Sequence, residues 1–461
     1  MLERLKNLFS QVDMTEGTIW KKIVAFAIPM IIGNVAQQLY NTVDSIVVGK
    51  YVGDNALAAV GSEGPIVNLI LVLFIGISMG ASIMVSQYFG SRDRESLSKT
   101  IGSSITLTAA ASIFMIVVGT PLIRPVLELL NTPESILDWC ESYLMITLIG
   151  IAGVAYYNIL TGVLRGLGDS LSALIYLLVA TVVNIVLDVW FVAEFGMGVA
   201  GVALATVIAQ FLSAFLCILK LRKMTNFFDM GLRYLKPDFH NIKTMVKLGL
   251  PSGITQAIFS MAMVIVQSLT NSFGEMVIAA NVIIMRVDGF AMMPNFSFGT
   301  AMTTYAGQNV GANQMDRVHK GAKQGTLIAV GTSAAITGVI LIFGKYLMGI
   351  FTNTAELVEL SANMMKILAV GYIAMAVTQS LSGVMRGAGD TMTPMWISMI
   401  TTVAIRVPLA YGLAYLTRTP ELPTGHYLSI WISLLTSWLL GALITFICYR
   451  RGKWATKGIK A

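Results

Sequence analysis

Two aspartates set within long apolar stretches are the residues of this sequence best placed to do chemistry. Asp44 and Asp188 lie in separate stretches, and Asn184 precedes Asp188 by four residues, so a helix would put both on one face. Thr206 lies in the next stretch, at a depth similar to that of the aspartates. Their oxygens suit a small hard cation such as Na⁺. Paired carboxylates in a low dielectric suit a proton equally well, so the spacing leaves both cations open.

The elements that must position these residues are membrane-spanning helices. Of the 461 residues, 56% are hydrophobic and only 12% are charged, whereas soluble domains carry about 25% charged residues. Twelve apolar stretches are long enough to span a bilayer, since a crossing helix needs about 20 residues. The sequence therefore predicts an all-α polytopic membrane protein with twelve transmembrane helices.

The charges between these stretches indicate orientation. Most of the 31 Lys and Arg residues fall on the side that carries both termini, so the positive-inside rule predicts cytoplasmic termini. The formal net charge of +7 is then mainly an orientation signal, and we expect no binding to nucleic acid.

An internal repeat divides the chain into halves. GVLRGLGDS at 162–170 returns as GVMRGAGDT at 383–391, an offset of 221 residues. The repeat predicts an N-lobe at 1–219, a cytoplasmic linker at 220–247 and a C-lobe at 248–461 with a cytoplasmic tail. Six spans per half give a parallel repeat, which suits alternating access by two rocking lobes.

The charges of the two RGxGD loops also suggest local ion pairs. We expect Arg165 to pair with Asp169, and Arg386 with Asp390, so that each loop braces its own lobe.

The motifs together resemble the multidrug and toxic compound extrusion (MATE) family over almost the whole chain. They are the opening GTIWKKIVAFAIPMIIGNVAQQLYNTVDSIVVGK, both RGxGD loops and NIVLDVWFV. The resemblance implies two pseudo-symmetric six-helix bundles. It is nearer to the DNA-damage-inducible F (DinF)-like branch, whose N-lobe cation or proton site matches Asp44, Asn184, Asp188 and Thr206. Supporting polar residues are Gln37, Tyr40, Asn41, Tyr143 and Asn158, of which Asn41 rests on helical spacing alone. The competing interpretation is that these groups only hydrogen-bond neighbouring helices.

The second half does not repeat this site, because at the same offset Asp188 maps onto Leu409. It has charges of its own, Arg286 and Asp288 in span eight and Arg406 in span eleven, which we expect to be buried near the midplane. Asp288 and Arg406 either form a structural ion pair or serve a cationic substrate. Other candidates for contact with a substrate are Gln256, Met285 and Met292.

These features predict a secondary active multidrug efflux transporter that exchanges amphipathic organic cations for H⁺ or Na⁺. The alternative is a flippase or exporter of a lipid-linked or polyprenyl-type metabolite. No P-loop motif is present and the three histidines lie in loops, so we expect no enzyme activity and no cofactor. We expect a monomer that contacts membrane lipid, in the plasma (inner) membrane of a prokaryote.

Overall fold

The computed structural model describes residues 12–130 and 132–459, without the side chains at 40–41, 43–46, 54–55, 57–59 and 61–65. Within this part the chain is helical and has no strand. Eleven of its helices are long and apolar enough to cross a membrane, and the number is twelve when one bent pair counts as a single span. The prediction of an all-α polytopic membrane protein is confirmed.

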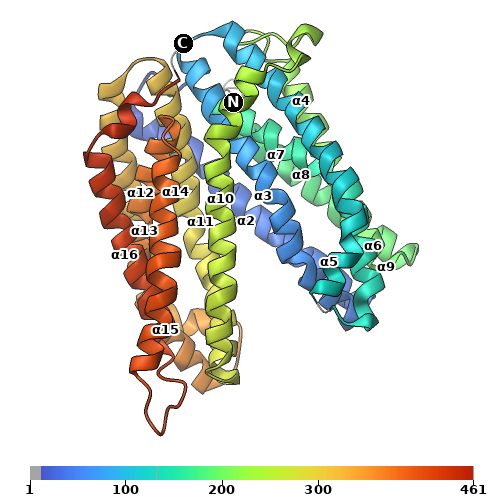
Figure 1. The fold of residues 1–461 in the computed structure, drawn as a ribbon, viewed down its shortest axis with the longest axis vertical. Coiled ribbons are helices and arrows are strands. Elements are labelled where there is room, and N and C mark those ends of the chain that lie inside the picture. Colours follow the sequence, from blue (N-terminus) through green and yellow to red (C-terminus); the bar gives the residue numbers. More distant parts are fainter. Residues whose placement is uncertain (1–11, 131, 460–461) are drawn as a thin grey trace, which may run out of the picture. The chain divides into compact units, whose positions relative to one another are not determined.

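The helices form two compact units (Figure 1). One contains Ile28–Gly253, and the other contains Met14–Ala27 and residues 254–459. The first unit holds most of α2 (Ile19–Tyr51), then α3 (Asp54–Gly90), α4 (Arg94–Gly119), α5 (Ile123–Leu129), α6 (Glu134–Ile149), α7 (Ile151–Gly166), α8 (Ser170–Val189), α9 (Gly198–Arg222) and the start of α10 (Phe239–Asn271). The second holds the rest of α10, then α11 (Glu275–Gly311), α12 (Met315–Gly349), α13 (Ala355–Gly387), α14 (Met392–Met399), α15 (Val407–Leu416) and α16 (Leu428–Arg450).

The unit boundaries differ from the lobes expected from the repeat. Residues 14–27 belong to the second unit, because backbone groups of Met14 bond to the side chains of Gln308 at 2.9 Å and Asn309 at 3.1 Å. The linker between the two long helices is shorter than 220–247, because α9 continues to Arg222 and α10 begins at Phe239.

Two helices pass from one unit to the other, and each carries a proline at that point. Helix α2 changes unit between Ala27 and Ile28, next to Pro29, and α10 changes unit two residues after Pro251. Proline removes a backbone hydrogen bond and bends a helix. The two helices that join the units thus have a built-in point of weakness there.

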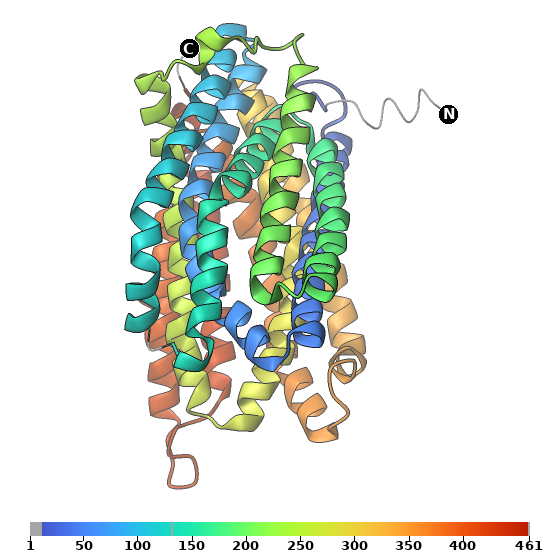
Figure 2. The same cartoon turned by 90° about the vertical axis from the view of Figure 1, so that its right-hand side faces the viewer.

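The two halves differ where the first unit has a bent pair of helices. In the first unit α6 and α7 meet at Gly150 with a bend of 50°. Their counterpart α13 runs unbroken past Gly371, the glycine at the equivalent position of the repeat. Figure 2, turned by 90° from Figure 1, likewise shows helices joined by loops and no strand among the described residues.

Glycines let helices approach closely within each unit. A Cβ at Gly80 of α3 would collide with the Met245 carbonyl of α10, and one at Gly249 would collide with the Gly76 carbonyl. In the second unit Gly383 and Gly387 bring α13 against α11 in the same way. Small residues at such contacts are typical of helix packing in membranes.

The RGxGD loops are braced by lysines and not by their own arginines. Asp169 caps α8 by accepting a hydrogen bond from the Ser172 amide at 2.9 Å, and it pairs with Lys220 at 3.1 Å. Asp390 accepts a hydrogen bond of 3.2 Å from the Thr393 amide in the first turn of α14, and it pairs with Lys457 at 3.0 Å. The expected pairs of these aspartates with Arg165 and Arg386 are therefore wrong. Each aspartate accepts a hydrogen bond from the first turn of the next helix, whereas each arginine lies in the last turn of the preceding one.

Replacing Asp169 with alanine is expected to destabilise the first unit by about 2 kcal/mol or more, because it removes a helix cap and leaves Lys220 without its partner. Thermal unfolding of the detergent-solubilised protein, followed by tryptophan fluorescence, measures the effect as a lower Tm. Asp138→Ala, which removes an exposed carboxylate, is the matched control. Equal Tm values for the two variants would contradict the bracing role.

Candidate functional site

The first unit brings together three of the predicted N-lobe residues. Asn184 and Asp188 lie one turn apart on α8, and both side chains are completely buried. The Asn184 amide donates a hydrogen bond of 3.4 Å to the Thr206 hydroxyl on α9. Two adjacent helices thus contribute a carboxylate, an amide and a hydroxyl oxygen inside a membrane-spanning bundle. Ionisable groups are costly to bury there, and those that occur usually have a function.

Two further features surround this cluster. A π-helical turn, Trp190–Glu194, begins two residues after Asp188, and such turns are frequent at functional sites. Gln210 lies one turn after Thr206 on α9, is buried, and its amide oxygen has no hydrogen-bond partner among the described residues. The sequence interpretation missed Gln210, although its four-residue spacing from Thr206 places both on one helix face.

The structure describes only some of the α2 side chains that we expect at this site. The helix runs through Asp44 as predicted, but the side chains of Tyr40, Asn41 and Asp44 lie outside the described ones. Gln37 is half-buried on the same helix.

The remaining supporting residues have local packing partners. Tyr143 on α6 packs against an apolar cluster that includes Val47 and Val202. Asn158 on α7 donates its amide to the Val154 carbonyl of its own helix at 2.8 Å. These contacts fit the competing interpretation that the two side chains serve helix packing.

The second unit contains a cavity of about 360 Å³ in the membrane-spanning part of the bundle. Asp288 on α11 and Arg406, the last residue of the π-helical segment Ile400–Arg406, both line it. Most of the wall is apolar and consists of methionine, aromatic and branched side chains: Phe259, Met263, Val266, Ile284, Met285, Met292, Phe296, Leu368, Met375, Ile430, Trp431, Leu434 and Trp438. An apolar pocket with a few polar groups is the usual form of a small-molecule site.

Asp288 and Arg406 do not form the structural ion pair that was one of their two predicted roles. The Tyr372 hydroxyl donates a hydrogen bond of 2.9 Å to Asp288 Oδ1. No ion pair within 4.0 Å joins Asp288 to Arg406, although both are described and interact electrostatically. A direct structural ion pair is therefore not formed. The sequence offered no signal for Tyr372, because a tyrosine in an apolar stretch is usual.

Of the other C-lobe candidates, three line the cavity and one is exposed. Gln256, Met285 and Met292 line the cavity as expected. Arg286 is exposed and does not line it, so its expected burial is wrong. Two residues from Asp288 is about 200° of helix rotation, which turns Arg286 to the opposite face.

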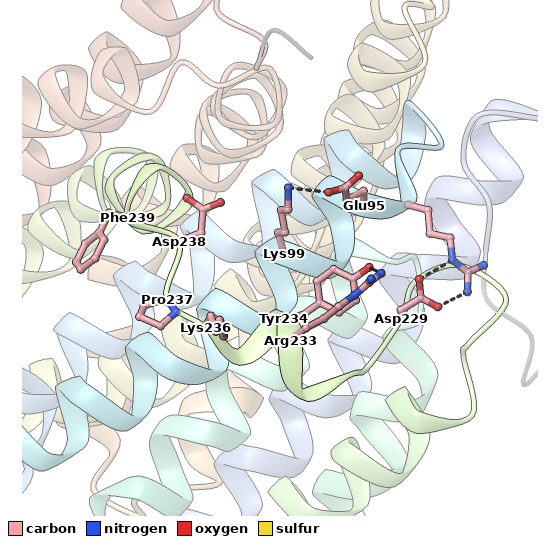
Figure 3. Close-up of a pocket in the computed structure, with 10 residues that line it drawn as sticks. Glu95, Lys99, Asp229, Arg233, Tyr234, Lys236, Pro237, Asp238 and Phe239 are labelled. Carbon is pink, nitrogen blue, oxygen red and sulfur yellow. Dashed lines mark hydrogen bonds and ion pairs between the residues drawn. The ribbon is translucent and has the colours of Figure 1, made fainter.

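A second cavity, of about 780 Å³, lies between α4 and the linker (Figure 3). Its carboxylates are all engaged by neighbouring groups. Glu95 pairs with Lys99 at 2.8 Å, Asp229 pairs with Arg94 at 2.6 Å, and Asp238 caps the start of α10. The hydrogen bonds from Arg94 lower the pKa of Asp229 below its ordinary value. The ion pairs dock the linker on α4, and we assign this cavity no catalytic or transport role.

Asp229→Asn is expected to loosen the linker, because the neutral amide no longer holds Arg94 electrostatically. Trypsin should then cleave after Arg233 about two- to fivefold faster, in keeping with the modest strength of exposed ion pairs. Since the folded pKa is lowered, wild-type docking should persist below the ordinary pKa of an aspartate and fail only at more acidic pH. Cleavage rates at pH 7 identical to those of the wild type would refute this role of the pair.

Comparison with known proteins agrees with this architecture. The MatE family profile matches residues 29–190 and 251–412, one match in each half. "Probable multidrug resistance protein YpnP" of Bacillus subtilis is 30% identical, over 96% of this chain and 97% of its own. "Probable multidrug resistance protein YoeA" of the same organism is 28% identical, over 95% and 94%. A solved structure titled "Outward-facing conformation of a multidrug resistance MATE family transporter of the MOP superfamily" superimposes with a TM-score of 0.88, at 25% identity and with 96% and 98% of the chains covered.

Proposed function

Because the chain belongs to the MatE family of multidrug efflux transporters, we propose that it exports amphipathic organic cations in exchange for H⁺ or Na⁺. It is a transporter and not an enzyme. The observation that carries the proposal is the burial of Asp188 beside the Asn184–Thr206 hydrogen bond in the middle of a membrane-spanning bundle.

The coupling cation binds at Asp188, Asn184 and Thr206, together with Asp44 of α2. For Na⁺ these residues supply only oxygen ligands, which hard cations prefer. For H⁺ a carboxylate deep in a bundle is the proton acceptor. This use of the N-lobe places the protein nearer to the DinF-like branch, in keeping with the absence of a carboxylate from the second half of α10.

The substrate binds in the cavity of the second unit. Asp288 supplies the negative charge that attracts a cationic nitrogen. Met285, Met292 and Trp438 supply an adaptable apolar wall, and thioether side chains can repack around ligands of different shape.

Exchange follows from the binding of cation and substrate to different arrangements of the two units. A ligand shifts such an equilibrium only through its different affinity for the two states. The proline-containing helices α2 and α10 join the units, and we assign the hinge to Pro29 and Pro251. The positive-inside bias supports cytoplasmic termini in a prokaryotic plasma (inner) membrane, and we propose that the monomer is the working form.

Accumulation of a fluorescent lipophilic cation such as ethidium in living cells tests the export function. Cells that produce the protein should accumulate less dye than cells with an empty vector. Asp138→Asn should export like the wild type, because its carboxylate is exposed. Equal accumulation in cells with and without the protein, at verified membrane expression, would refute export of this substrate class.

A further inference from the structure

The linker of the first unit contains a short 3₁₀ turn, Leu232–Leu235, with an apolar side and a basic side. A 3₁₀ helix has about three residues per turn. Leu232 and Leu235 therefore share one side, and Arg233 shares another with Lys236, the residue after the turn. All four side chains are exposed, that of Leu232 to 85%. The turn thus presents apolar and basic groups next to each other.

The remaining residue of the turn fixes it on α4. Tyr234 is buried, and its carbonyl lies so close to Gly102 of α4 that a Cβ on this glycine would collide with it. The Thr106 hydroxyl of α4 donates a hydrogen bond of 2.7 Å to the Leu235 carbonyl. The packing on α4 therefore sets the direction in which the apolar and basic sides of the turn point.

The turn lies beside the ends of three membrane-spanning helices. Helix α4 begins at Arg94, α9 ends at Arg222, and α10 begins at Phe239, whose side chain is 78% exposed. A cavity of about 190 Å³ is lined by Ile101 and Ile105 of α4 together with the two leucines of the turn. Exposed Leu and Phe next to Lys and Arg are typical of segments that lie in the interface of a membrane.

The larger cavity at the basic side contains two cations that no acid neutralises (Figure 3). Its three acids pair with Lys99 and Arg94 or cap α10. The Arg233 guanidinium stacks at 4.5 Å from the centre of the Tyr234 ring and donates to the Tyr234 hydroxyl, but no described acid lies within 4.0 Å of it. Lys236 makes no hydrogen bond or ion pair to any described residue. Both cations are therefore available to an anion.

We propose that Leu232, Arg233, Leu235, Lys236 and Phe239, which we call the linker surface, bind an anionic phospholipid of the adjacent leaflet. The lipid phosphate lies between the guanidinium and the ammonium group, both of which bind phosphate well. The acyl chains pack on the exposed leucines and on Phe239. Basic residues directly beside the end of a span are a usual means of recognising anionic lipid. A free phosphate would use the two cations but not the apolar side chains. The lipid is bound and not transported, so the inference does not rest on the proposed function.

Quenching of tryptophan fluorescence by brominated lipid tests the inference. Phe239→Trp places a fluorophore on the linker surface, and the protein with Phe239 intact gives the background from the other tryptophans. Both full-length proteins are reconstituted in phosphatidylcholine vesicles with increasing fractions of dibrominated phosphatidylglycerol or dibrominated phosphatidylcholine. The two quenching curves give the ratio of the binding constants of the two lipids at this surface.

We expect phosphatidylglycerol to bind about 5- to 30-fold more tightly than phosphatidylcholine at low salt, because each basic residue near an anionic lipid surface contributes about fivefold. High salt should reduce this ratio by screening the charges. Arg233→Gln combined with Lys236→Gln should lower the ratio to about one. Arg233→Lys combined with Lys236→Arg retains both charges and should retain the preference.

The matched control removes the same amount of charge elsewhere. Arg450→Gln combined with Arg451→Gln replaces two exposed arginines at the end of α16 and should leave the ratio unchanged. Equal binding of the two lipids by the Phe239→Trp protein, or a ratio that survives the replacement of Arg233 and Lys236 by glutamine, would overturn the inference. Loss of the preference in excess glycerol phosphate would also overturn it, since the cations would then bind a free phosphate.

Discussion

Asp188→Asn is expected to reduce ion-driven drug efflux about 5- to 150-fold, the range of typical coupling free energies between sites. Asparagine has nearly the shape of aspartate, so the packing of α8 against α9 should persist. What is lost is the one charge of the described cluster, because Asn184 and Thr206 are neutral. Initial rates of dye uptake into inverted membrane vesicles, in which export from the cytoplasm becomes uptake into the lumen, measure the loss at equal protein content.

The expected loss is specific to the buried carboxylate. Asp138→Asn removes an exposed carboxylate on α6 and should retain wild-type efflux. Asp44→Asn should act like Asp188→Asn if the two aspartates share one cation. Full efflux by a well-folded Asp188→Asn protein would show that the coupling site does not lie in the first unit.

Asp288→Asn is expected to weaken the binding of an amphipathic cation about 10- to 100-fold, because it removes the negative charge of the cavity. Arg406 would then be the only charged group on the cavity wall, and its charge repels the ligand. Tyr372→Phe should have a smaller effect in the same direction, since it removes the hydrogen bond that orients Asp288. Equilibrium titration of the purified protein with ethidium measures both changes.

The control for this variant lies on the same helix. Glu275→Gln removes an exposed acid at the start of α11 and should leave ethidium affinity unchanged. The substrate assignment would fail if Asp288→Asn and Glu275→Gln bound ethidium as tightly as the wild type.

The architecture was predictable because it depends on patterns that are local in the sequence. Apolar stretches of span length become helices whatever their neighbours are. The repeat at an offset of 221 residues then predicts a second, similar bundle. Helical spacing likewise placed Asn184 and Asp188 on one face, and Thr206 faces them from the adjacent helix.

Contacts between helices that are distant in the sequence were not predictable. The partners of Asp169 and Asp390 are Lys220 and Lys457, which come from the end of α9 and from the chain after α16. An arginine four residues away in the sequence was the nearer candidate for each aspartate. Helix capping turned each aspartate toward the start of the following helix and out of its reach.

The cavity of the second unit shows the same limit. Its wall combines residues of α10, α11, α13, α16 and the segment before α15. Trp431 and Tyr372 are ordinary residues of apolar stretches, until packing places Trp431 in the same cavity wall as Arg406 and brings Tyr372 against Asp288. Only the rarity of charge in the spans, 12% over the whole chain, singled out those two residues beforehand.

Transport by the purified protein in liposomes tests the central claim most directly. The vesicles contain a fluorescent lipophilic cation, and either a pH gradient or a Na⁺ gradient is imposed while the other ion is balanced. Ion-coupled export predicts that one of these gradients drives the dye against its own concentration gradient, and that Asp188→Asn slows this uphill movement about 5- to 150-fold. Failure of both gradients to drive the dye through folded wild-type protein, or uphill transport by Asp188→Asn at the wild-type rate, would contradict it.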